Sequence, residues 1–264
     1  MRMRVAQTKS LTESSWRSAM RYLKQIVKKI PGVLPAYYYA ACQYTALKLK
    51  RRTAGDIFTD ICRGNKWGGS DSVSGSGSDL FQTRVVRNEL LAVWRNFSIH
   101  AMLDIPCGDF HWMKHVDLEG IEYTGADIVT DLILGNAQYE ASNVHFCKLN
   151  LIDDTLPQVD LVFCRDCFVH LSFRDTFIAL HNICNSGSTY LLTTTFTSLP
   201  HNHDIATGQW RTLNLEVPPF SFPPPFKTIN EGCTEGDGAF SDKSLGLWRV
   251  EDIRECLMNH GYGK

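Results

Sequence analysis

The stretch Ala101-Met-Leu-Asp-Ile-Pro-Cys-Gly-Asp109 decides the fold, because an apolar run ends there in a turn that carries acids and a glycine. Residues 101–105 predict a short buried strand. Gly108 lets backbone approach a ligand closely, and Asp104 and Asp109 can receive an ammonium group. A dinucleotide fingerprint needs three glycines to seat a pyrophosphate, which these acids would repel. The stretch therefore favours a cationic ligand over NAD.

Further apolar runs alternate with helical patterns along the chain. The runs are 122–127, 144–149, 159–164 and 189–193, and the predicted helices are 83–97, 109–117, 131–140 and 173–184. Strands that are apolar on both faces and alternate with helices predict a parallel sheet covered on both sides. Right-handed crossovers make it a doubly wound, mostly parallel α/β sheet. Such sheets bind ligands beyond the carboxyl ends of their strands.

Polar residues stand at these strand ends in a recognisable order. Asp127 ends the second run, Asn150 follows the third, and Asp166 and His170 follow the fourth. With the Asp-x-Pro-Cys-Gly turn, this order resembles the class I S-adenosylmethionine-dependent methyltransferases over residues 101–171. The resemblance implies a Rossmann-like fold, S-adenosylmethionine (AdoMet) as cofactor, and an enzyme that transfers a methyl group.

The resemblance also implies which residues contact the cofactor. They are Asp104, Pro106, Cys107, Gly108, Asp109, Asp127, Ile128, Asn150, Leu151 and Arg165. In the family, the acid at Asp127 holds the ribose hydroxyls, and the position of Asn150 binds the adenine amino group. Pro106 and Phe110 depart from the family's commoner motif, which has glycines there.

Asp166 and His170 are the candidate catalytic residues, because family side chains at the end of this strand face both the methyl group and the substrate. Either side chain could serve as the base for a hydroxyl acceptor. Two structural alternatives stay open: Asp166 could simply pair with Arg165, and His170 could be satisfied by backbone.

The segment 198–240 interrupts the alternation with many prolines, which disfavour helix and central strand. Trp210, Arg211 and Asn214 there indicate either a substrate wall or surface packing. We expect no metal, because the spacing of His201, His203 and Asp204 makes a poor metal site. The Cys164–Cys167 pair is interpreted as packing, since no second pair with zinc spacing exists.

The amino-terminal residues 1–52 hold 12 of the 27 basic residues and one of the 28 acids. They predict a basic amphipathic helical extension that packs on the main domain, contacts an anionic membrane surface or serves in organelle targeting. Residues 53–98 are expected to form a second segment, a Gly/Ser loop at 67–78 (linker or lid) and a lead-in helix. The core is expected at 99–264. Its acidic balance makes nucleic acid an unlikely partner.

The carboxyl-terminal residues predict a helix over 248–260. They leave little room for the two-stranded hairpin that ends the sheet in the family. We therefore expect a truncated hairpin, unless Lys243–Trp248 supplies a strand. The sequence thus predicts a methyltransferase acting on a hydroxyl of a small molecule or of a glycan- or lipid-linked acceptor. The alternative is an inactive, methyltransferase-like binding or scaffold protein. Nine scattered cysteines favour a reducing, cytoplasmic location, with peripheral membrane attachment open.

Overall fold

The computed structural model describes residues 47, 49 and 52–259. The predicted basic extension, residues 1–52, therefore lies almost wholly outside the described residues. The compact unit that carries the sheet runs from Leu49 to Lys264. Among the described residues, no helix combines the length and the apolar character that crossing a membrane requires.

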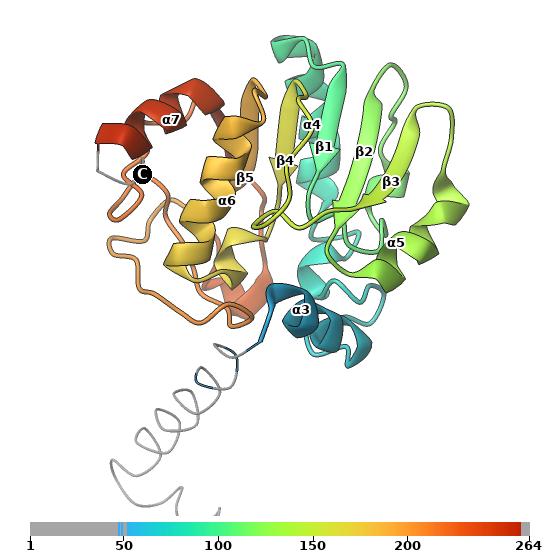
Figure 1. Cartoon of the computed structure of the whole chain (residues 1–264), viewed down its shortest axis with the longest axis horizontal. Helices are drawn as coiled ribbons and strands as arrows, with labels where there is room; N and C mark the ends of the chain where they lie inside the picture. Colours follow the sequence, from blue (N-terminus) through green and yellow to red (C-terminus); the bar gives the residue numbers. More distant parts are fainter. Residues whose placement is uncertain (1–46, 48, 50–51, 260–264) are drawn as a thin grey trace, which may run out of the picture. The chain divides into compact units, whose positions relative to one another are not determined.

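A single seven-stranded sheet forms the centre of this unit, with the strand order β3-β2-β1-β4-β5-β7-β6 (Figure 1). The strands are β1 (Ala101–Asp104), β2 (Glu122–Asp127), β3 (Val144–Lys148), β4 (Leu161–Cys164), β5 (Tyr190–Phe196), β6 (Lys227–Asn230) and β7 (Lys243–Arg249). Strands β1 to β5 are mutually parallel, and β7 runs antiparallel to both β5 and β6. The prediction of a doubly wound, mostly parallel α/β sheet is confirmed.

Helices cover both faces of the sheet because successive strand residues point to opposite sides. The helices are α3 (Ala54–Arg63), α4 (Arg84–Phe97), α5 (Thr130–Asn136), α6 (Phe173–Asn185) and α7 (Val250–Asn259). In β4, Val162 and Cys164 pack in the cluster that contains α6 and α7, whereas Leu161 and Phe163 pack in the cluster that contains α4. Helix α6 begins at a cap, where the Ser172 hydroxyl accepts a hydrogen bond from the amide of Asp175 at 3.1 Å.

The predicted helix over 109–117 is wrong. Only a 3₁₀ turn forms there, at Met113–His115. Gly108 and Phe110 adopt left-handed φ values of 59° and 56°, which a helix cannot contain. This bend places the Phe110 ring against Tyr123, 5.4 Å between centroids, so burial of an aromatic ring replaces the helix.

The expectation of a truncated carboxyl-terminal hairpin is also wrong. Strands β6 and β7 form an antiparallel pair, and β7 lies between β5 and β6. β6 begins two residues after the last proline, Pro225, inside the segment interpreted as an insertion. β6 therefore divides this segment: residues 197–226 are irregular, and residues 231–242 hold only a 3₁₀ turn at Glu235–Gly238. Trp248 belongs to β7, so α7 begins at Val250.

Candidate functional site

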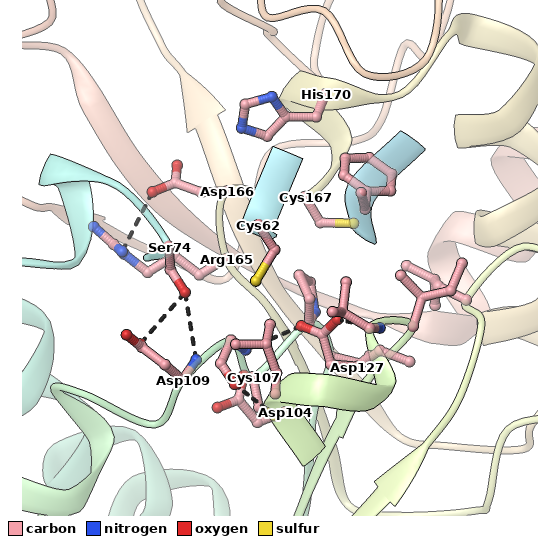
Figure 2. A pocket seen from close by; sticks show the side chains of 18 of the residues that line it. Cys62, Ser74, Asp104, Cys107, Asp109, Asp127, Arg165, Asp166, Cys167 and His170 are labelled. Carbon is pink, nitrogen blue, oxygen red and sulfur yellow. Dashed lines mark hydrogen bonds and ion pairs between the residues drawn. The ribbon is translucent and has the colours of Figure 1, made fainter. Parts of the chain in front are cut away.

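A cavity of about 130 Å³ lies at the carboxyl ends of the parallel strands (Figure 2). Helix α3 and the loop 67–78 contribute Phe58, Cys62, Trp67 and Ser74 to its lining. Its lining also contains every residue predicted to contact the cofactor and both predicted catalytic residues: Asp104, Pro106, Cys107, Gly108, Asp109, Asp127, Ile128, Asn150, Leu151, Arg165, Asp166 and His170. These residues come together because the carboxyl ends of parallel strands share one edge of the sheet.

Asp104, the last residue of β1, is 3% exposed and accepts a hydrogen bond from the Tyr123 hydroxyl at 2.7 Å. Burial raises the pKa of this carboxyl to about 7, although the Tyr123 bond acts in the opposite direction. The carboxylate forms no ion pair with any described residue. It is therefore a buried acid that a cationic ligand would stabilise in its charged form.

Asp127, the last residue of β2, is held by backbone donors. Its two carboxylate oxygens accept hydrogen bonds from the amides of Val129 at 2.8 Å and Gly108 at 3.2 Å. Burial raises its pKa to about 6, and these backbone bonds oppose the rise. The bond to Gly108 also ties the end of β2 to the turn after β1.

The loop 67–78, called the lid below, is hydrogen-bonded to this turn. The Asp109 carboxylate accepts hydrogen bonds from the Ser72 hydroxyl at 2.9 Å and the Val73 amide at 3.1 Å. A β-carbon at Gly108 would lie 2.3 Å from the Ser74 hydroxyl oxygen, so only glycine permits this close approach. Because Asp109 holds the lid, Asp104 is the better placed of the two acids to receive an ammonium group.

The side chain of Asn150 shapes the turn that follows β3. Its amide oxygen accepts from the Ile152 amide at 3.0 Å, and its amide nitrogen donates to Asp153 at 2.6 Å. One oxygen lone pair remains for the predicted bond to adenine.

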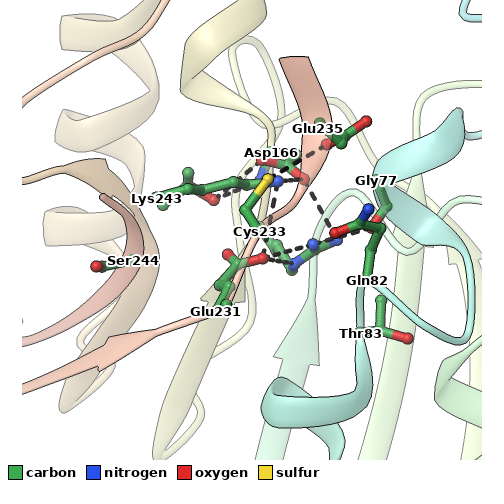
Figure 3. Close-up of polar contacts among 12 residues, drawn as sticks. Gly77, Gln82, Thr83, Asp166, Glu231, Cys233, Glu235, Lys243 and Ser244 are labelled. Atoms are coloured by element: carbon green, nitrogen blue, oxygen red, sulfur yellow. Dashed lines mark hydrogen bonds and ion pairs between the residues drawn. The ribbon is translucent and has the colours of Figure 1, made fainter. Parts of the chain in front are cut away.

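Asp166 stands after β4 between two cations (Figure 3). Its Oδ2 lies 2.7 Å from Lys243 Nζ and 3.3 Å from an Arg165 guanidinium nitrogen. Although burial acts in the opposite direction, Lys243 and Arg165 hold the pKa of this carboxyl well below its usual range. A carboxylate so strongly stabilised in its charged form is a weak base. The sequence alternative, a structural pair with Arg165, therefore describes Asp166 better than proton abstraction does.

His170 lines the cavity, and its ring bonds to backbone, as the structural alternative predicted. Its Nδ1 lies 3.1 Å from the Gln209 carbonyl oxygen, which can only accept a hydrogen bond. Nδ1 therefore carries the proton and Nε2 keeps its lone pair. Burial lowers the pKa of this imidazole, so it is neutral at pH 7. Its ring lies 5.0 Å from that of Trp67, measured between centroids.

The three residues predicted as a substrate wall separate in the structure. Trp210 lines a second cavity, but Arg211 and Asn214 line neither of the two cavities and are buried. Arg211 donates to the Leu171 carbonyl, and Asn214 donates to the Leu199 carbonyl at 3.0 Å. Their interpretation as substrate contacts is corrected, because each satisfies a backbone carbonyl. Arg211 satisfies that of Leu171, just before α6, and Asn214 satisfies that of Leu199, in the irregular segment.

Sequence reasoning missed Lys243 and Glu231. Arg165 donates to Glu231 at 2.6 Å, and Lys243 Nζ lies 3.7 Å from the same carboxylate. Arg165 also donates to the Gly77 carbonyl at 3.0 Å, which connects this buried cluster to the lid. The only sequence signal was a lysine that opens an otherwise apolar run, and that pattern does not identify its partners. No group of three or more metal-ligating side chains occurs within the described ranges.

Comparison with known proteins gives structural neighbours only. No family model matches the chain, and no curated protein sequence matches it. N-methyltransferase NodS from Bradyrhizobium japonicum WM9 is 12% identical, with 64% of this chain and 96% of that chain covered and a TM-score of 0.48. PigF with SAH is 11% identical, with 63% of this chain and 55% of that chain covered and a TM-score of 0.47.

Magnesium protoporphyrin IX methyltransferase from Synechocystis PCC 6803, with bound SAH, is 16% identical. The coverage is 46% of this chain and 58% of that chain, with a TM-score of 0.38. The chain thus spans little more than half the length of this neighbour and of PigF. Two of these structural neighbours, NodS and the magnesium protoporphyrin IX enzyme, are methyltransferases by name.

Proposed function

We propose that the protein is an AdoMet-dependent methyltransferase of the Asp-x-Pro-Cys-Gly type that acts on a hydroxyl group. One observation carries the proposal: two buried carboxylates, Asp104 and Asp127, line one cavity at the ends of neighbouring parallel strands. Their pKa values are raised by burial, to about 7 and about 6, and neither accepts from a cationic side chain of a described residue. Such acids are costly unless a ligand supplies their partners.

AdoMet fits this set of donors and acceptors. Asp104 would receive the ammonium group, Asp127 would hold the ribose hydroxyls, and Asn150 would accept from adenine. Ile128 and Leu151 add apolar lining. When bound, the cofactor supplies a methyl group on a cationic sulfur, ready for displacement.

The protein's own contribution to the reaction is alignment and a base. The lid, held by Asp109 and Arg165, excludes water from the cavity and fixes the position of the reactants. His170 takes the proton from the acceptor hydroxyl at Nε2, while the Gln209 carbonyl fixes the ring's tautomer. Asp166 keeps Lys243 and Arg165 neutralised beside the site and does not exchange a proton.

The alternative, an inactive scaffold, is not favoured. It rested on the altered turn, on Asn150 and on the expected short carboxyl terminus. The turn, however, is held by hydrogen bonds, Asn150 keeps an acceptor lone pair, and the β6–β7 hairpin is present. The Cys107 amide donates to Ala126 at 2.8 Å, and Asn136 donates to the Gly108 carbonyl at 2.8 Å. A cytoplasmic location and contact of residues 1–52 with an anionic surface belong to this proposal too. Salt-sensitive binding of the full chain to acidic vesicles tests the second.

Ligand-dependent melting tests the proposal. AdoMet at about 100 times its Kd should stabilise the protein by about 2.7 kcal/mol, and NADH should not stabilise it. Asp127→Asn should abolish most of this stabilisation, whereas Asp117→Asn, an exposed acid outside both cavities, should retain it. Absence of stabilisation by AdoMet in the wild-type protein contradicts the proposal.

A further inference from the structure

A second cavity, of about 250 Å³, adjoins the first. Trp67, Ser74, Asp166 and His170 line both, so the base of the proposed reaction faces the two spaces. The other residues of the second cavity come from the lid, from the end of β5, from the irregular segment before β6 (Trp210), from the loop between β6 and β7, and from the first residue of β7, Lys243. An acceptor held in this cavity would therefore reach His170, which also lines the cofactor pocket.

Aromatic rings form the rim of this cavity. Trp210 is 47% exposed although its ring packs edge-on against Phe240, with 5.0 Å between centroids. Phe196 contacts both rings, at 6.4 Å from Trp210 and 6.1 Å from Phe240. The Trp210 ring is thus fixed in place by its neighbours while much of its surface stays open. Such a ring offers a flat platform for a ligand.

Charged groups converge on the floor. A β-carbon placed at Gly77 would lie 3.3 Å from Glu235 Oε2, 3.4 Å from Asp166 Oδ2 and 3.6 Å from Lys243 Nζ. The Ser76 hydroxyl donates to Glu235 Oε1 at 2.6 Å. Three carboxylates (Asp166, Glu231 and Glu235) and two cations (Lys243 and Arg165) meet at and behind this floor. The cluster therefore carries one net negative charge, and its carboxylates hold lone pairs that can accept further hydrogen bonds.

This combination restricts the chemistry of a ligand. An anionic acceptor, such as a phosphate or a carboxylate, would be repelled by the net negative charge. A purely apolar acceptor would cover the carboxylates and the ammonium group without replacing their hydrogen bonds to water. A ring that has apolar C–H faces and several neutral hydroxyl groups satisfies both the aromatic rim and the polar floor.

We propose that the second cavity is the acceptor site and that the acceptor is a neutral carbohydrate, stacked on Trp210. This inference rests on the proposed function. In the transfer, an acceptor oxygen bonds to the methyl carbon of AdoMet as the carbon–sulfur bond breaks. The electron pair of that bond stays on sulfur, and the hydroxyl proton passes to His170 Nε2, which later releases it to water.

An array of neutral and acidic glycans, probed with the full-length protein in the presence of S-adenosylhomocysteine, tests the inference. We expect neutral glycans to bind and their uronate, sialylated or phosphorylated counterparts not to bind. Trp210→Ala should weaken binding about tenfold. Phe226→Ala should bind as wild type, because Phe226 is a comparably exposed aromatic residue, at 54%, that lines neither cavity.

Trp210→Phe is a second variant. Because it keeps an aromatic ring, it should fold even if Trp210→Ala does not, and it should bind neutral glycans more weakly than wild type. Binding to no glycan, preference for acidic glycans, or equal binding by wild type and both Trp210 variants overturns the inference. Calorimetry with AdoMet separates the two proposals. If AdoMet binds and no glycan does, the acceptor assignment fails while the proposed function stands; if AdoMet does not bind, the proposed function itself fails.

Discussion

Replacing the buried acid Asp104 by asparagine should stabilise the ligand-free protein at pH 8 and should leave its stability nearly unchanged at pH 5. In the folded protein the pKa of Asp104 is about 7, against an ordinary value of 3.8. Between these two values the folded state binds more protons than the unfolded state, so stability falls as pH rises and levels off above 7. Asparagine removes this dependence because it does not titrate.

The size of the effect follows from the same values. Each pKa unit corresponds to about 1.4 kcal/mol. Asp104 therefore destabilises the fold by about 4 kcal/mol at pH 8, where it is ionised in the folded protein, and by about 2 kcal/mol at pH 5, where it must take up a proton on folding. An amide at this position keeps an oxygen to accept from the Tyr123 hydroxyl, but its NH₂ group needs a partner, which costs about 1–3 kcal/mol at either pH. Because this cost is the same at both pH values, it cancels when the stability gain of the variant at pH 5 is subtracted from its gain at pH 8. The remaining difference is about 2 kcal/mol.

Urea unfolding of wild type and Asp104→Asn at pH 5 and pH 8 measures this difference. Asp117→Asn, which changes an exposed acid, should show no comparable dependence on pH. The same asparagine variant should lose most of its stabilisation by AdoMet, because the proposed partner of the ammonium group is gone. An Asp104→Asn variant that gains no more stability at pH 8 than at pH 5 refutes the reasoning.

Three further predictions concern the base, the buried cluster and a helix cap. Burial lowers the pKa of His170, so in a pH–rate profile methyl transfer should keep its full rate as pH falls through 7 and decline only below 6.5. A decline in rate centred above pH 6.5 contradicts the role of His170 as the base. Lys243→Met should lower the free energy of unfolding in urea by about 3 kcal/mol, because Asp166 and Glu231 lose a counter-charge. Adding Asp166→Asn should restore part of that loss, and unchanged stability of the single variant would show that the cluster is not coupled. Ser172→Ala should cost about 1 kcal/mol in the same assay, since it removes the cap of α6, and a loss below about 0.3 kcal/mol is evidence against that cap.

The residues at strand ends were predictable because the topology of a parallel sheet brings them together. Once 101–105 and 122–127 are recognised as neighbouring strands, Asp104 and Asp127 must approach one edge of the sheet. The helix over 109–117 was not predictable in the same way, because apolar spacing does not reveal the left-handed backbone at Phe110. Burial of that ring against Tyr123 decided the local structure.

The buried cluster of Arg165, Asp166, Glu231 and Lys243 could not be predicted from the sequence, for a different reason. Lys243 and Asp166 are 77 positions apart, and Arg165 and Glu231 are 66 apart. Nothing in a single sequence says which of many charges pair at such distances. The position of Arg211 was not predictable, because its residue type favours the surface, whereas its guanidinium donates to the buried carbonyl of Leu171, between β4 and α6.

The insertion of β7 between β5 and β6 has a consequence for synthesis. A ribosome makes Asp104, Asp127, Arg165 and Asp166 well before it makes Lys243, so a nascent chain that ends short of β7 already holds the cofactor side of the site. In that chain Asp166 lacks its lysine, and β5 has an unpaired edge that can recruit another strand. When β7 docks, the same event completes the site with Lys243 and pairs the exposed edge of β5. Until then, the incomplete chain is a natural client for chaperones.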